Sequence, residues 1–238
     1  MCPLPDMNVP IPDILDAAAQ AYINARCSAA YLHDMRGELQ TLGSCIELLS
    51  RGAAQNPAPD LVLKWSALAK RAMERHGRSL SDTLHHMTLQ QDEGASDVDL
   101  GVLIQDVIKL LRNDAAGKSV KFNLELDPNL VISTLAQKCR LSILGLSVSI
   151  LDTAAAGAII DLRAKRDNGL ACIEFSSALA FPAPASLPEL CSDSTRERMG
   201  SLELFLAYAS RWAANGGGRL AVSDESDAPG KVMIRYPL

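Results

Sequence analysis

Apolar residues recur at alternating intervals of three and four along residues 12–52. They occupy six successive positions: Leu32, Met35, Leu39, Leu42, Ile46 and Leu49. Such heptad spacing gives a helix one apolar stripe and is typical of a helix that packs along its length in a bundle. Gly52, Pro57 and Pro59 then interrupt the pattern, so a turn is expected here.

A second helix is predicted over residues 60–89, with Asp60 as its N-cap. Its apolar positions follow the same spacing: Leu61, Trp65, Leu68, Ala72, Leu80, Leu84 and Met87. Two long helices with a short connection form an antiparallel hairpin. Because one hairpin of this length cannot bury its own apolar stripe, we expect two copies to pair as a homodimeric four-helix bundle.

The pattern changes to a mixed helix and strand order after a polar linker that contains Gly94. Helices are predicted over 98–113, 135–155 and 201–214, and strands over 119–126, 159–165, 170–176, 219–223 and 232–236. This order favours an α/β sandwich, one sheet covered by helices. The fold class is therefore α+β, with a flexible N-terminus (1–11), a helical hairpin domain (12–92) and a sandwich domain (97–238).

Composition narrows the function classes. A hydrophobic fraction of 48% and a charged fraction of 21% are typical of a globular protein, and the net charge of −5 argues against nucleic-acid binding. No apolar run reaches the roughly 18–20 residues that span a bilayer, and the start of the chain lacks signal-peptide features. The six cysteines have no metal-ligand spacing, so we expect a reduced, cytoplasmic protein without a metal or membrane association.

The stretch Leu32-His-Asp-Met-Arg-Gly-Glu-Leu-Gln40 carries candidate chemistry. His33 lies beside the apolar stripe, where a neutral imidazole is an accessible nucleophile near pH 7. Asp34 can orient the ring or accept its proton, and Arg36 supplies positive charge near an incoming phosphoryl group. Gly37, Gln40 and Ser44 share the same exposed side of the helix.

This stretch resembles the H-box of sensor histidine kinases, in which the phosphoaccepting His precedes an acidic residue and, two positions later, an Arg. Residues 97–238 are similar in order to the kinase ATP-binding domain, with Asp97-Val-Asp-Leu100 at its entry. Residues 216–222 and 230–238 resemble its closing strands. The resemblance implies that His33 accepts phosphate, assisted by Asp34 and Arg36.

Three departures from the family concern its nucleotide site. Ser149 and Thr153 stand where the family has two asparagines that include the magnesium ligand. The strand end around Ser176 lacks the adenine-binding Asp and its glycines, and the Gly-rich phosphate loop survives only as Gly200. Three lost contacts remove about 4–9 kcal/mol, against the roughly 8 kcal/mol of a micromolar site. The ATPase-like domain is therefore expected to have a degenerate nucleotide site and to hold no cofactor.

Two further departures lie in the H-box. Gly37 stands where kinases that also dephosphorylate their partner carry Thr or Asn, so hydrolysis of a partner's phospho-Asp is disfavoured. Glu38 replaces the usual proline, which should leave the helix straight.

These features predict a histidine phosphotransferase of a bacterial phosphorelay, similar to those of cell-cycle and sporulation relays. His33 would take a phosphoryl group from the receiver domain of one response regulator and pass it to another, with Mg²⁺ bound only by the receiver. The receiver would contact the exposed side of the first helix and the part of the second helix level with His33: Gly37, Gln40, Ser44, Arg75, His76 and Ser79.

Two alternatives stay open. The chain could be a non-catalytic pseudokinase adaptor that binds kinases or regulators, with His33 unused. It could also be an ATP-dependent sensor kinase with a divergent nucleotide site, which the three lost motifs disfavour.

Overall fold

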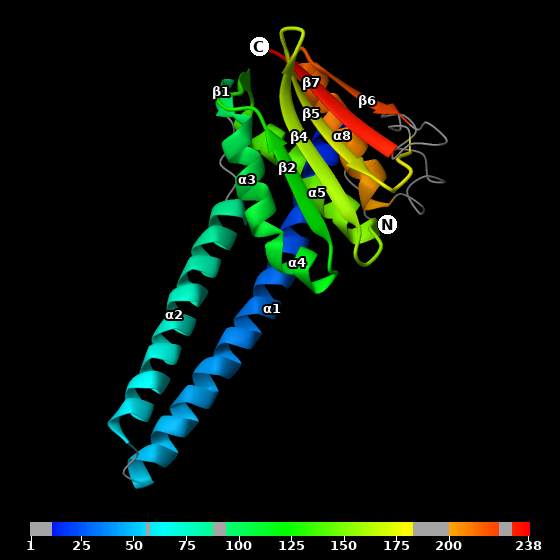
Figure 1. The fold of residues 1–238 in the computed structure, drawn as a ribbon. Coiled ribbons are helices and arrows are strands. Elements are labelled where there is room, and N and C mark those ends of the chain that lie inside the picture. Colours follow the sequence, from blue (N-terminus) through cyan, green and yellow to red (C-terminus); the bar gives the residue numbers. More distant parts are fainter. Residues whose placement is uncertain (1–10, 56–57, 88–93, 183–199, 224–229) are drawn as a thin grey trace, which may run out of the picture. The chain divides into compact units, whose positions relative to one another are not determined.

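The computed structural model describes the chain except residues 1–10, 56–57, 88–93, 183–199 and 224–229 (Figure 1). The chain divides into two compact units. One combines residues up to Ile23 with residues from Gln90 to Leu238, and the other spans Asn24–Leu89. We call them the α/β unit and the hairpin unit and describe each by itself.

The hairpin unit is built from two helices that the heptad pattern predicted, the part of α1 (Ile11–Gln55) that follows Ile23 and α2 (Pro59–Met87). Their short connection brings them side by side in opposite directions (Figure 1). The helix α2 begins one residue earlier than expected, at Pro59, since proline is tolerated in the first turn. Asp60 therefore lies inside the first turn rather than at the N-cap.

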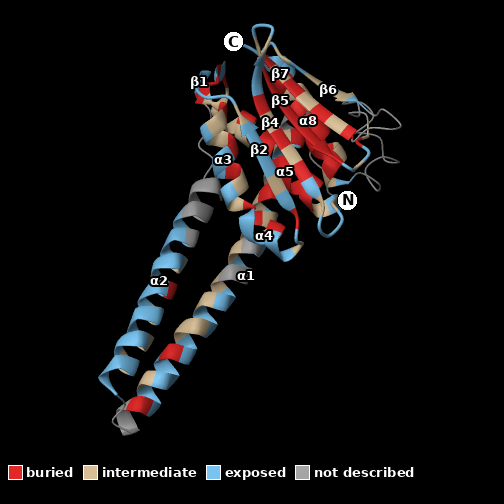
Figure 2. Ribbon diagram, viewed as in Figure 1, coloured by how far each residue is buried: buried red, intermediate tan, exposed pale blue. Residues whose placement is uncertain are grey.

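The apolar stripe of α1 is only half covered within one chain. Met35, Leu42 and Leu49 of α1 are half-buried. Cys45 of α1 and Ala72 of α2 are buried. The alternate heptad positions are exposed: Leu32 at 55%, Leu39 at 52% and Ile46 at 60%. Figure 2 shows that most of the length of these two helices is exposed or half-buried. The hairpin alone therefore leaves a row of large apolar side chains in contact with water.

The α/β unit holds the remaining elements. They are β1 (Ser96–Asp99), α3 (Leu100–Leu110), α4 (Arg112–Gly117), β2 (Lys121–Leu126), β3 (Val131–Thr134), α5 (Ala136–Thr153), β4 (Ile159–Asp167), β5 (Leu170–Ser177), α8 (Ser201–Asn215), β6 (Arg219–Ser223) and β7 (Gly230–Pro237). The main sheet is mixed, in the order β2-β4-β5-β7-β6, with only β2 and β4 parallel; β1 and β3 form a separate antiparallel pair.

One face of the main sheet forms the core with the helices α5 and α8. Buried residues alternate along β4 and β7, and their row on β4 is Ile160, Leu162 and Ala164. The helices α5 and α8 cover this face (Figure 1) and pack closely, since Gly145 lies directly against the Phe205 ring. The expected α+β class, with one sheet covered by helices, is confirmed.

The first sandwich element differs from the prediction. The helix expected from Val98 begins at Leu100, because Val98 lies in β1 and pairs with Ile132 of β3. The Asp99 side chain then caps α3 by accepting from Val102 N at 3.0 Å. Strands of four residues carry too little alternation to be recognised in a sequence, so β1 and β3 were both missed.

The first turns of α1 belong to the α/β unit, which corrects the expected boundary of a hairpin domain at residues 12–92. Leu15, Ala19 and Ile23 are buried there. The Asp16 carboxylate accepts hydrogen bonds from Lys138 Nζ and Trp212 Nε1, each at 3.0 Å. Periodicity predicted this helix but could not show which element covers its beginning.

We predict that Gly145→Ala destabilises the α/β unit. A Cβ at this position would overlap the Phe205 ring, and such overpacking typically costs about 1–3 kcal/mol. Gly43→Ala is the matched control, because Gly43 lies in α1 with nothing within 4 Å of an added Cβ. Thermal unfolding should show a lower Tm for Gly145→Ala only; equal Tm values would contradict the packing described here.

Candidate functional site

The candidate nucleophile His33 lies in the middle of α1, which runs without interruption from Ile11 to Gln55. The helix contains no proline beyond its first turn. Glu38 lies within it without a break, as expected for a residue that stands in place of a proline. The side chains of His33, Asp34 and Ser79 lie outside the described residues. Their positions are therefore known only along the helix axes.

The expected receiver-facing positions on α1 are open to water. Arg36, Gly37, Gln40 and Ser44 are all exposed. Nothing lies within 4 Å of a Cβ built on Gly37, whose carbonyl accepts a hydrogen bond from the Thr41 hydroxyl at 3.0 Å. This side of α1 is therefore an exposed polar surface, and the missing side chain of Gly37 leaves open space on it.

A polar contact joins the two helices of the hairpin beside this surface. The Glu38 carboxylate lies 3.8 Å from Arg75 Nε and 3.4 Å from His76 Nδ1. The His76 ring stacks on Tyr31, with ring centroids 6.1 Å apart and planes at 25°. Tyr31 and Glu38 flank His33 in the sequence, so Arg75 and His76 of α2 lie level with this stretch of α1.

Tyr31 and Glu38 were missed as site residues by the sequence analysis. A signal was present, since Tyr31, Glu38 and the buried Cys45 follow one another at intervals of seven residues and so share one side of the helix. The Glu38 side chain is only 16% exposed. The contacts of this partly buried carboxylate favour this register of the hairpin, because α2 supplies both of its neighbours, the Arg75 guanidinium and the His76 ring.

The helix α5 carries two of the residues expected at a degenerate nucleotide site, Ser149 and Thr153. Ser149 is fully buried, and its hydroxyl has no hydrogen-bond partner among the described residues. The Thr153 hydroxyl donates to the Ser149 carbonyl at 2.8 Å. The Ser149 hydroxyl is therefore closed off from solvent, and the Thr153 hydroxyl is engaged by its own helix.

A lysine covers the carboxyl end of α5. Lys118 Nζ donates to the carbonyls of Leu151 at 3.1 Å and Asp152 at 2.9 Å, and lies 3.6 Å from Asp152 Oδ1. A cation at a helix C-terminus is stabilised by the helix dipole. The Tyr22 hydroxyl also donates to Asp152 Oδ2 at 3.4 Å, so this carboxylate is engaged from two sides.

The other two residues of the expected degenerate site lie on separate elements. Ser176 is a buried residue of β5, paired in register with Asp161 and Lys231. Gly200 is exposed and forms the N-cap of α8. The segment 183–199, which precedes Gly200, lies outside the described residues.

Within the part of the chain that the structure describes, no three His, Cys, Asp or Glu side chains gather as metal ligands do. Cys27, Cys45, Cys139 and Cys172 are buried and form no disulfide with another described cysteine, and burial raises the pKa of Cys172. None of the described helices is both long and apolar enough to cross a membrane.

Comparisons with known proteins return only solved structures. No protein-family model and no curated protein matches the chain. The structures include the catalytic domain of the histidine kinase ThkA (12% identity, 60% of this chain and 95% of that one, TM-score 0.49). They also include a histidine kinase from Burkholderia phymatum (16%, 90% and 97%, 0.47) and the Acinetobacter baumannii histidine kinase AdeS (13%, 86% and 97%, 0.47).

We predict that restoring an asparagine at Ser149 harms the fold. Ser149 has no exposed surface, so the larger amide would overpack the centre of α5 and lower the unfolding free energy by about 1–3 kcal/mol. Thr153→Asn, at an exposed position of the same helix, is the matched control and should stay near the wild-type value. Denaturant unfolding measures both; an unchanged midpoint for Ser149→Asn would refute this description of α5.

Proposed function

We propose that the protein is a histidine phosphotransferase of a two-component phosphorelay. His33 would accept a phosphoryl group from the aspartate of one receiver domain and pass it to the aspartate of another. The observation that carries this proposal is the exposed side of α1 around His33, held in register with α2 by Glu38, Arg75 and His76.

The chemistry requires one nucleophile and no cofactor of this chain. An imidazole nitrogen of His33 attacks the phosphorus, the P–O bond to the receiver aspartate breaks, and an N–P bond forms. The carboxylate leaves with the electron pair, and the imidazole N–H proton passes to Asp34 or to water. The receiver would supply the Mg²⁺, and the reverse reaction loads the second receiver.

The exposed surface fits a docking role for the receiver. Gly37 leaves open space beside the helix, and Gln40 and Ser44 offer neutral hydrogen-bonding groups one and two turns after Gly37. Arg75 and His76, with Ser79 on the next turn, would contact the receiver from α2. Arg36, an exposed guanidinium, is suited to stabilise the charge of the transferring phosphoryl group.

The state of α5 supports a donor other than ATP. Ser149 is buried, the Thr153 hydroxyl is engaged, and Lys118 covers the carbonyl end of the helix. The Mg²⁺ of a bound nucleotide would need oxygen ligands at this end. The proposal therefore assigns the α/β unit no nucleotide, and assigns the protein to the cytoplasm together with its receiver partners.

A homodimer is part of the proposal, because the exposed Leu32, Leu39 and Ile46 need a cover. On α2, Leu61 and Leu68 are also exposed, at 44% and 37%. Burying apolar surface is worth about 25 cal/mol for each Å². A second hairpin that packs on these rows would complete a four-helix bundle of the usual kind.

The central prediction concerns which histidine carries the phosphate. A receiver phosphorylated with a radiolabel should transfer the label to wild-type protein and none to His33→Gln. His76→Gln is the matched control, since His76 is the neighbouring histidine of the hairpin and should change only the rate of labelling. Lability of the label in acid together with its stability in alkali identifies a phosphohistidine, because an aspartyl phosphate is hydrolysed in alkali as well.

The alternatives give different results in the same assay. Receiver binding without any labelling of the wild type would support the adaptor. Labelling from radiolabelled ATP alone, lost in His33→Gln, would support a kinase. Either result contradicts the phosphotransferase.

The dimer is tested by Leu39→Glu. A buried carboxylate in each copy would face the bundle interface, so the dimer should dissociate at least a hundredfold more readily. Ser50→Glu, at an exposed polar position of α1, is the control and should remain dimeric. Sedimentation velocity measures both; a monomeric wild type, or a dimer indifferent to Leu39→Glu, would overturn this part of the proposal.

A further inference from the structure

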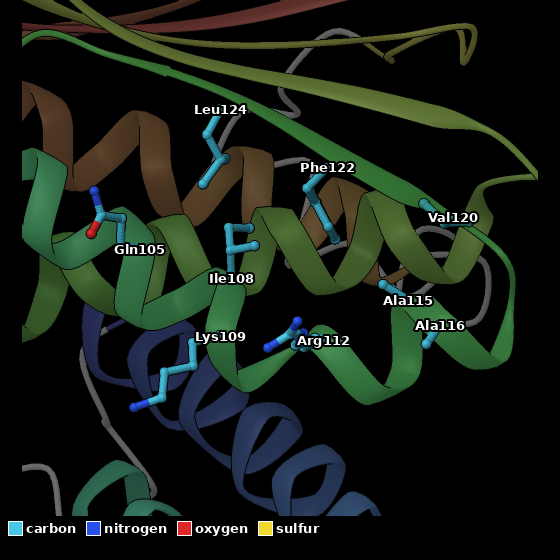
Figure 3. A pocket seen from close by; sticks show the side chains of 9 residues that line it. All are labelled: Gln105, Ile108, Lys109, Arg112, Ala115, Ala116, Val120, Phe122 and Leu124. Atoms are coloured by element: carbon cyan, nitrogen blue, oxygen red, sulfur yellow. The ribbon is translucent and has the colours of Figure 1, made fainter.

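A groove lies on the α/β unit between the helices α3 and α4 and the strand β2. Its volume is about 420 Å³ and it is open to solvent on one side. Figure 3 shows Ile108 pointing into it from α3, with Phe122 and Leu124 of β2 on the opposite wall. We call this feature the β2 groove.

The apolar wall of the groove is a part of the sheet's core face that the helices leave uncovered. Phe122 pairs in register with Ile160, and Leu124 with Leu162. Both β4 partners have no exposed surface, whereas Leu124 is 40% exposed. The helix layer thus stops short of β2, and apolar side chains of the same face meet water in the groove.

Two cations stand on the helical wall. Lys109 is in the last turn of α3 and Arg112 begins α4, and both are exposed (Figure 3). Among the described residues, no carboxylate forms an ion pair with either within 4.0 Å. In a chain of net charge −5, two cations without a partner beside an apolar wall favour an occupant that is both apolar and anionic.

The backbone of β2 adds a third feature. β2 is the terminal strand of the main sheet. Lys121 N donates to the Ala158 carbonyl just before β4, and Asp127 N, just after β2, donates to the Ala164 carbonyl of β4, so the odd-numbered amides along β2 face β4. Since strand amides alternate in direction, the N–H groups of Phe122 and Leu124 point to the free edge. An edge of this kind can pair with a further strand.

We propose that the β2 groove binds an extended segment of a partner protein that carries apolar and acidic side chains on the same face, at positions two residues apart. The segment would pair with the edge of β2, place its apolar side chains against Phe122 and Leu124, and direct carboxylates from that same face to Lys109 and Arg112. This is recognition by strand addition. A protein segment fits better than a small molecule, because the groove is open and offers a row of backbone groups. The inference does not depend on the phosphotransfer at His33.

The test uses the full chain and a library of short displayed peptides. Selection on the wild type, with counter-selection on Lys109→Glu/Arg112→Glu, should enrich peptides in which aliphatic or aromatic residues and Asp or Glu occur two or four positions apart, on one face of an extended strand. A synthetic peptide of the most enriched sequence is then measured by fluorescence anisotropy. The double charge reversal should weaken its binding at least tenfold, Leu124→Ala should weaken it several-fold, and added salt should weaken it as well.

Lys121→Glu/Lys165→Glu is the matched control. These cations alternate with Phe122 and Leu162 along their strands, so they lie on the other face of the sheet, and the change in net charge is the same. This variant and His33→Gln should bind like the wild type. The inference is overturned if no peptide is enriched, or if the enriched peptides bind both double variants equally. It is also overturned if a small apolar anion, for which octanoate is the probe, binds in the groove and no peptide does.

Discussion

The burial of the apolar side of α1 is the constraint on which the rest of the structure depends. A helix of 45 residues is not stabilised by propensity alone and needs packing along its length. Residues up to Ile23 find it in the α/β unit, where Leu15 and Ala19 are buried and Asp16 accepts two hydrogen bonds. The following turns pack against α2 on one side only, so the apolar row of Leu32, Leu39 and Ile46 stays exposed unless another protein surface buries it.

The same helix carries the proposed chemistry, and its local contacts explain why His33 is a credible site. A nucleophile on a helix is positioned by the backbone, and the Glu38 contacts with Arg75 and His76 hold the neighbouring turn against α2. The α/β unit contributes differently. Its helix α5 is committed to packing against Phe205 and to contacts with Lys118, which leaves its hydroxyl groups engaged or buried.

Much of this fold could be predicted from sequence because its long elements repeat a strong pattern. The two hairpin helices, α5, α8 and the five strands of the main sheet lie within a few residues of their expected ranges. The strands β1 and β3 were missed because four residues carry little periodicity, and the break between α3 and α4 at Leu111 falls inside a continuous helical pattern. Tyr31 and Glu38 escaped notice because their role arises only when α2 lies beside them. The exposure of Leu32, Leu39 and Ile46 likewise depends on which partner covers each side of the stripe.

We propose that this chain receives its phosphate from a receiver domain rather than from ATP. Intact-mass spectrometry tests it on one preparation divided between two donors, each with Mg²⁺. The protein mixed with a phosphorylated receiver should gain the mass of one phosphoryl group, and peptide mapping should place it on His33. The portion mixed with ATP should keep its original mass. A gain from ATP, or no gain from any receiver of the same genome, would contradict the account.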